Sequence, residues 1–228
     1  MDALTTLFTE YNVLAAFWMT ILLTFWGAVG SMVIGTVIAI CRVSPIGVLQ
    51  KFGAAYVTAF RDLPLTLVVV FCSLGMYYAM QLNLAPGSPT EIVDNGFRWG
   101  VVALSVYHAA FVAESIRSGV NTIPVGQAEA ARSIGLDFAA SLRNVILPQE
   151  MRGAISPLGN TLIALTKNTT VVAVVGVNEA AYMMRNMIEF NGSLLMVIFA
   201  IMATGFVILT LPMGLLFTWL SNRLAVLR

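Results

Sequence analysis

The chain has 228 residues, of which 59% are hydrophobic and only 10% are charged, and its formal net charge is +1. Soluble domains carry about 25% charged residues, so this composition excludes an ordinary soluble globular protein and predicts an all-α integral membrane protein. The small net charge argues against a nucleic-acid partner.

Cysteine and histidine are scarce. Cys41 and Cys72 fall in apolar stretches, and His108 is the single histidine. A zinc site or a disulfide framework would need more of these residues at closer spacing. We therefore expect no metal site in this chain.

Long apolar stretches follow one another along the sequence, and each is suited to crossing a hydrocarbon core of about 30 Å. We expect five spans, at about residues 14–41, 54–80, 99–116, 154–177 and 193–220, in one transmembrane domain of residues 1–228. Gly27, Gly30 and Gly35 in the first span suit close helix packing in lipid. A helix can begin or bend at Pro64 in the second, and Pro212 predicts a kink in the last.

The connecting segments are polar and rich in turn residues. We expect a short turn at residues 42–53, loops at 81–98 and 178–192, and a basic tail at 222–228. Residues 1–12 lack the basic start of a cleaved signal peptide.

The positive charges predict the orientation. With the N-terminus outside, the outer side holds only Arg98 and Arg185. The inner side then holds the remaining loop cations, which are Arg42, Lys51, Arg117, Arg132, Arg143, Arg152, Arg223 and Arg228. Positive residues concentrate on the cytoplasmic side of membrane proteins, so we expect a multi-pass protein of the cell membrane with a cytoplasmic C-terminus.

Residues 117–153, between the third and fourth spans, are longer and more polar than a bare connector requires. Good helix formers run from Gln127 to Ile134, and Gly135 is a typical C-terminal stop. Asp137 can cap a second helix that ends before Pro148. We expect a compact helix–glycine–helix unit in water on the cytoplasmic side.

The same residues carry a family resemblance. Glu129-Ala130-Ala131, Gly135 and Ile146-Leu147-Pro148 resemble the EAA loop of permease subunits in binding-protein-dependent ABC importers. The flanking AAFVAESIRSGVNTIPVGQAEAARSIG and ILPQEMRGAISPLGNTLIALTKNTT are similar to the polar amino-acid subfamily, closest to the glutamate importers of Gram-positive bacteria. The similarity extends more weakly from about Thr20 to the C-terminus.

The resemblance implies a coupling helix that docks on a separate ATP-binding subunit. The coupling residues would be Gln127, Glu129, Ala130, Ala131, Ile134, Gly135 and Leu136. The chain has no GxxxxGK[ST] phosphate loop, so ATP and Mg²⁺ are expected in the partner ATPase and no cofactor in this chain. The implied partners are a second permease subunit, two ATP-binding subunits and an extracytoplasmic substrate-binding protein, all at a lipid membrane.

Polar groups at membrane depth are costly and are candidates for the transport path. Lys167 lies near the middle of the fourth span and is followed by Asn168, Thr169 and Thr170. The matching family stretch reads Lys-Asp-Thr-Ser, and its aspartate lies near cationic substrates in some members. Asn168 replaces that acid, which favours an anionic amino acid. The alternative is that Lys167 snorkels or binds a backbone carbonyl.

Other path candidates have structural alternatives. Arg61 either faces an anion or anchors its helix at the lipid headgroups. His108 either meets substrate or binds a neighbouring helix, and Glu114 and Arg117 are spaced for a local ion pair. The full set of path candidates is Arg61, His108, Asn160, Lys167, Asn168, Thr169 and Thr170.

Two other functional classes remain open. A stand-alone channel or ion-driven carrier would share the composition but would leave the EAA-like unit without a role. A membrane enzyme would need a nucleophile–base pair or a metal cluster, and the sequence offers neither pattern, so we expect no catalytic residues.

Overall fold

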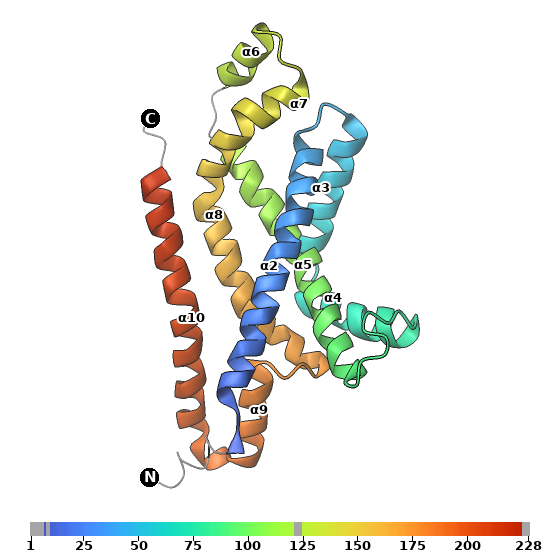
Figure 1. Ribbon diagram of the computed structural model, residues 1–228, viewed down its shortest axis with the longest axis vertical. Coiled ribbons are helices and arrows are strands. Elements are labelled where there is room, and N and C mark those ends of the chain that lie inside the picture. The colour runs from blue at the N-terminus through green and yellow to red at the C-terminus, as the bar shows by residue number, and fades with distance from the viewer. Residues whose placement is uncertain (1–6, 8–9, 121–124, 225–228) are drawn as a thin grey trace.

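The computed structural model describes residue 7, residues 10–120 and residues 125–224. Every regular element in these residues is a helix, which confirms the prediction of an all-α chain (Figure 1). Four of the helices are long and apolar enough to cross a membrane, and a bent helix pair would make a fifth span.

The centre of the fold is the pair α2 (Val13–Val43) and α5 (Glu91–Val120) (Figure 1). Their backbones approach closely where α2 carries glycine. A Cβ atom built on Gly35 would lie 2.6 Å from Val112 Cβ and 2.8 Å from the Ala109 carbonyl oxygen. A Cβ atom on Gly30 would overlap Ser105. Small residues therefore permit this helix contact, as predicted.

The second span is not one helix. Helix α3 (Gly47–Asp62) is followed by α4 (Leu65–Val70) and a π-helical segment η1 (Phe71–Ala79), and the two parts meet at 102°. Leu63 and Pro64 are extended, because the proline ring disfavours a helical residue before it. The predicted break at Pro64 is confirmed, but the expected start at residue 54 is wrong, since the turn before α3 ends at Ile46.

Helix α5 begins earlier than expected. The prediction of a loop at residues 81–98 is wrong from Glu91 onward, because Glu91 to Arg98 form the first two turns of the helix. Buried Asn95 holds this end in place, because its side chain binds the Leu84 N–H at 2.8 Å and the Glu91 carbonyl at 2.8 Å.

The segment after α5 forms α6 (Val125–Ser133), α7 (Phe138–Ser141), a π-helical turn η2 (Leu142–Ile146) and α8 (Leu147–Asn168). The prediction that a helix ends before Pro148 is wrong, because helical structure passes from η2 into α8. Pro148 has no N–H to donate to the turn before it, and the helix passes from the wider π-helical turn η2 to regular α-helix at this position.

The last part contains a 3₁₀ segment η3 (Thr169–Val175), α9 (Ala180–Phe190), a short 3₁₀ turn η4 (Gly192–Leu194) and α10 (Leu195–Leu224), which runs through Pro212. Helix α9 lies in a stretch that was expected to be a loop. It is capped by Glu179, whose carboxylate accepts from the N–H groups of Ala181 and Tyr182. Burial raises the pKa of this carboxyl group, and the two backbone donors oppose that shift.

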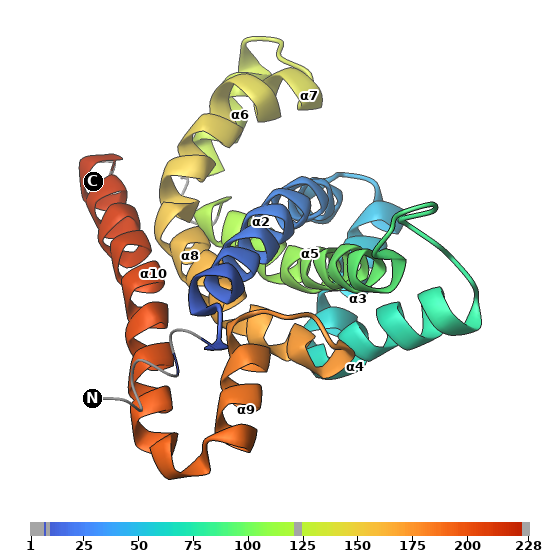
Figure 2. The same cartoon turned by 60° about the horizontal axis from the view of Figure 1, so that its bottom comes forward.

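The two ends of the molecule differ. The α6–α7 unit, the α2–α3 turn and the end of α10 lie at one end, and α9 lies at the other (Figures 1 and 2). Most of the cations that were assigned to the inner side therefore share the α6 end. Arg228 and the rest of 225–228 lie outside the described residues.

Candidate functional site

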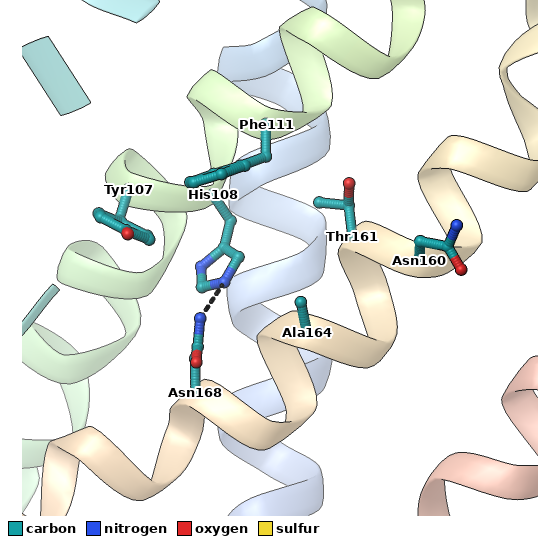
Figure 3. A pocket seen from close by; sticks show the side chains of 7 residues that line it. All are labelled: Tyr107, His108, Phe111, Asn160, Thr161, Ala164 and Asn168. Atoms are coloured by element: carbon teal, nitrogen blue, oxygen red, sulfur yellow. Dashed lines mark hydrogen bonds between the residues drawn. The ribbon is translucent and has the colours of Figure 1, made fainter. Parts of the chain in front are cut away.

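A cavity of about 270 Å³ lies between α5 and α8 (Figure 3). Helix α5 contributes Tyr107, His108 and Phe111, while α8 contributes Asn160, Thr161, Ala164 and Asn168. Residues 160, 164 and 168 recur every four positions and therefore share one face of α8. The cavity gathers three of the predicted path residues, His108, Asn160 and Asn168.

His108 joins the two walls of the cavity. It is 1% exposed, and its Nδ1 lies 3.0 Å from the Leu104 carbonyl oxygen within α5. Its Nε2 lies 3.1 Å from the Asn168 amide nitrogen on α8 (Figure 3). His108 therefore binds a neighbouring helix, as one of the two alternatives predicted, and it also lines the cavity, while contact with substrate stays a prediction.

The other predicted residues of α8 and η3 do not line this cavity. Thr169 is fully buried and donates to the Thr166 carbonyl at 2.8 Å, and Thr170 donates to the Lys167 carbonyl at 2.7 Å. Lys167 itself is exposed in the last turn of α8. It comes seven residues after Asn160, so it lies on the same side of the helix.

Arg61 lies in the last turn of α3, just before the break at Pro64. Its guanidinium carbon is 5.9 Å from the centroid of the Phe111 ring, which lines the cavity. Arg61 is thus in cation–π contact with one lining residue of the cavity without itself lining it.

The cavity has lining residues that the sequence did not single out. Tyr107, Phe111, Thr161 and Ala164 are conventional residues of a membrane helix, so their residue types carry no signal. The four-residue spacing from Asn160 through Ala164 to Asn168 could have placed Ala164. Only the packing of α5 on α8 could have placed the two aromatic rings.

The α6–α7 unit has the geometry expected at Gly135. This glycine has φ +86°, the Gly135 N–H binds the Arg132 carbonyl at 2.9 Å, and the Leu136 N–H binds the Ala131 carbonyl at 3.2 Å. This pair of bonds forms a Schellman motif. Asp137 Oδ1 accepts from the Ala140 N–H at 2.7 Å, so the predicted cap of the second helix is confirmed.

Most of the predicted coupling residues form a surface of this unit. Gln127, Glu129, Ala130 and Gly135 are exposed, and Ile134 is 78% exposed. Ala131 is buried and Leu136 is half-buried, so these two residues contribute to the unit's own packing.

An ion-pair cluster lies at the end of α5 that leads toward α6. The predicted pair is confirmed, since Arg117 Nη2 is 2.6 Å from Glu114 Oε1. Glu114 also pairs with Arg42 of α2, which the sequence did not indicate. The carboxylate therefore links the ends of α2 and α5.

The described residues hold no group of three or more His, Cys, Asp or Glu side chains that could bind a metal ion. The side chains that line the cavity are two aromatic rings, two amides, one imidazole, one hydroxyl and one methyl group.

Comparison with known families decides the class of this arrangement. Residues 3–226 match the model of the family described as "Binding-protein-dependent transport system inner membrane component". The chain belongs to this family. Membership places it among multi-pass membrane permeases that work with other subunits, and it confirms the predicted family.

Individual permeases of the family are similar over almost their whole length. The glutamate transport system permease protein GluC of Corynebacterium glutamicum is 54% identical over 216 residues, which is 94% of this chain and 95% of that protein. A probable glutamine ABC transporter permease protein GlnM of Bacillus subtilis is 31% identical over 91% of each chain.

A solved structure shares the fold of this permease. A chain from the crystal structure described as an amino acid ABC transporter with histidines matches with a TM-score of 0.79 at 27% identity, over 98% of this chain and 96% of that chain. The bent α3–α4 pair and the additional helix α9 thus belong to a fold that aligns with a known permease along the chain.

Proposed function

We propose that this chain is the membrane-spanning permease subunit of an ATP-driven importer whose substrate is glutamate or a related acidic amino acid. The observation that carries the proposal is the 54% identity to a glutamate permease across 94% of the chain. The replacement of the family aspartate by Asn168 supports the same substrate class, because it leaves no carboxylate among the residues that line the α5–α8 cavity.

The substrate passes the α5–α8 cavity in this proposal. The cavity lies against one side of a single chain, so a second permease subunit is needed to enclose a path. Asn160 and Lys167 are both exposed on the cavity side of α8 and would face that path. A lysine there attracts an anion, and the amides and the imidazole supply hydrogen bonds.

The α6–α7 unit is the proposed coupling element. Ile134 is a large apolar side chain that is 78% exposed, and covering it with another protein would remove this apolar surface from water. We assign that role to one of two ATP-binding subunits, which hold ATP and Mg²⁺. When these subunits close, the short helix moves as a rigid body and carries the permease between its outward-open and inward-open states.

The orientation follows from this assignment. The α6 end faces the cytoplasm of a bacterium, where ATP is present, and the N-terminus lies outside. An extracytoplasmic binding protein then delivers substrate to the opposite end, near α9.

The proposal is tested by uptake of labelled glutamate into proteoliposomes that contain the permease, its ATPase subunits and its binding protein. We expect uptake that requires ATP and that excess aspartate inhibits more strongly than lysine. Uptake that is unchanged without the ATPase would support the alternative of a stand-alone channel or ion-driven carrier, and the proposal would then be wrong.

Coupling is tested at Gly135. Gly135→Asp places a charge and a strained left-handed residue on the proposed contact, so we expect at least a tenfold loss of ATP-coupled uptake. Gly47→Asp is the matched control, because Gly47 begins α3 at the same end of the molecule and has no atom within 4 Å of its built Cβ position. Equal uptake by the two variants would remove the coupling role of α6.

Selectivity is tested at Asn168. Asn168→Asp adds a carboxylate to the cavity, so we expect weaker uptake of acidic amino acids relative to neutral ones. An unchanged or improved ratio would contradict the argument for an anionic substrate.

A further inference from the structure

The pairing of His108 with Asn168 has a consequence for the chemistry of the cavity. Both ring nitrogens of His108 have partners, the Leu104 carbonyl oxygen at 3.0 Å and the Asn168 amide nitrogen at 3.1 Å. The imidazole is 1% exposed, so water does not compete for either bond. The two partners therefore determine which ring nitrogen carries the hydrogen.

The backbone carbonyl determines the tautomer. A carbonyl oxygen only accepts hydrogen bonds, so Nδ1 must carry the hydrogen. A neutral imidazole then has a lone pair on Nε2, which only accepts. Asn168 must therefore donate an N–H to His108, since the opposite orientation of its amide would bring Oδ1 against the lone pair. Figure 3 shows the amide nitrogen directed at the ring.

We propose that His108 is a positioning residue, which fixes the orientation of the Asn168 amide and keeps the two side chains without net charge. The carbonyl oxygen and the second N–H of Asn168 then remain for a ligand. This inference deepens the proposed function and rests on it for its transport measurement. It identifies the polar site offered to the substrate as the half-buried Asn168 amide of α8, held by the buried His108 of α5.

The contact between His108 and residue 168 also determines how a carboxylate at position 168 would change the protonation of His108. Aspartate has no N–H, so it can only accept from Nε2, and His108 would have to bind a proton to donate. The result would be an imidazolium–carboxylate pair with zero net charge instead of an isolated negative charge. No other lining side chain of the cavity is charged. Two charged residues lie close to the lining residues: Arg61, in contact with the Phe111 ring, and Lys167, exposed next to Asn168 in the chain.

A spectroscopic test does not depend on transport. His108 is the only histidine of the chain, so the full chain with a histidine-free affinity tag contains one ¹⁵N-labelled imidazole in lipid nanodiscs, whose Nδ1 and Nε2 resonances report which nitrogen is protonated. We expect a neutral ring protonated at Nδ1 at pH 7, and a doubly protonated ring in Asn168→Asp. Asn160→Asp is the matched control, because Asn160 lines the same cavity without a bond to His108, and the ring should stay neutral there.

The transport test measures coupling between the two positions. We expect Asn168→Asp to lower glutamate uptake a few-fold when position 108 is the wild-type histidine. In a His108→Gln background, where no imidazolium can form, we expect the same substitution to lower uptake at least tenfold. Asn160→Asp should have the same effect in both backgrounds. Equal losses for Asn168→Asp in the two backgrounds, or a wild-type ring protonated at Nε2, would overturn the inference. If the wild type imports no glutamate, the proposed function fails, and the ¹⁵N signal still decides the role of His108.

Discussion

Helices α5 and α10 are each 30 residues long, but they occupy opposite kinds of environment. In the most apolar part of α5, 67% of the residues are buried inside the chain, whereas in α10 the share is 11%. The more apolar helix is therefore the less buried one. Lipid tails are as apolar as leucine side chains, so an apolar helix is equally stable facing lipid or facing protein. Hydrophobicity therefore identifies a membrane span but does not indicate whether it lies at the centre of the fold.

The residue types of the two helices agree with their burial. Helix α5 carries the only histidine, the Glu114 ion pairs and the buried serines Ser105 and Ser115. Helix α10 exposes a series of large apolar side chains, among them Leu211, Leu215 and Trp219. Packing, polar contacts and the candidate site are concentrated on α5, and matched substitutions can measure this difference.

The largest difference is expected between two glycines. Gly35→Ala forces the α2 backbone away from α5, since the new Cβ atom would meet Val112 and the Ala109 carbonyl, and overpacking of this kind costs about 3 kcal/mol. Gly214→Ala in α10 meets its nearest atom at 3.6 Å and should be neutral or stabilising by up to about 1 kcal/mol. Unfolding by SDS in mixed micelles measures both. Similar costs would contradict the central position of the α2–α5 contact.

Leucine truncation gives the next largest contrast. Leu104→Ala removes a fully buried side chain and should cost about 2 kcal/mol. The cost comes mainly from lost van der Waals contacts around the new cavity, because an apolar side chain is about equally stable in lipid and in the protein interior. Leu215→Ala changes a side chain that is 64% exposed and should cost less than about 0.5 kcal/mol. A cost at Leu215 comparable to that at Leu104 would indicate that another protein chain covers α10.

The Glu114 ion pairs give a smaller effect. Glu114→Gln leaves Arg42 and Arg117 without their carboxylate in a half-buried position, which should destabilise the chain by about 1–2 kcal/mol. The exposed Glu189 at the other end of the molecule provides the comparison, and Glu189→Gln should change the stability by less than about 0.5 kcal/mol. The expected effect should persist in 0.5 M salt, because the pairs are partly shielded from solvent.

The smallest effect is expected at the cap of α9, outside both long helices. Glu179→Ala removes the acceptor for the Ala181 and Tyr182 N–H groups and should cost about 1 kcal/mol, whereas Glu179→Gln keeps a carbonyl oxygen and should cost less. Thermal unfolding in nanodiscs measures the difference. No difference between the two variants would show that capping does not stabilise α9.

Elements that depend on local chemistry could be predicted from the sequence. The stop at Gly135, the cap at Asp137 and the break at Pro64 are all present, because each depends on the conformational limits of one residue. Errors occurred where distant contacts decide the structure. The first turns of α5 depend on Asn95 binding Leu84, and α9 depends on a buried carboxylate and on packing against α2 and α10.

The candidate site divides in the same way. His108, Asn160 and Asn168 could be selected from the sequence, because polar groups are costly in a membrane span. Their hydrogen bond, the aromatic rings beside them and the position of Lys167 outside the cavity could not be selected, since these depend on how α5 and α8 are rotated against each other.

By itself, the sequence of this protein determined a membrane location, an all-helical chain and the local chemistry of its turns, because apolar length and single-residue conformational limits act over a few residues. Only the tertiary structure decided which helix is central, because lipid accepts apolar faces as readily as protein does. It also decided that His108 meets Asn168 and that Glu114 joins Arg42, since these residues are 60 and 72 positions apart and meet only when the helices pack.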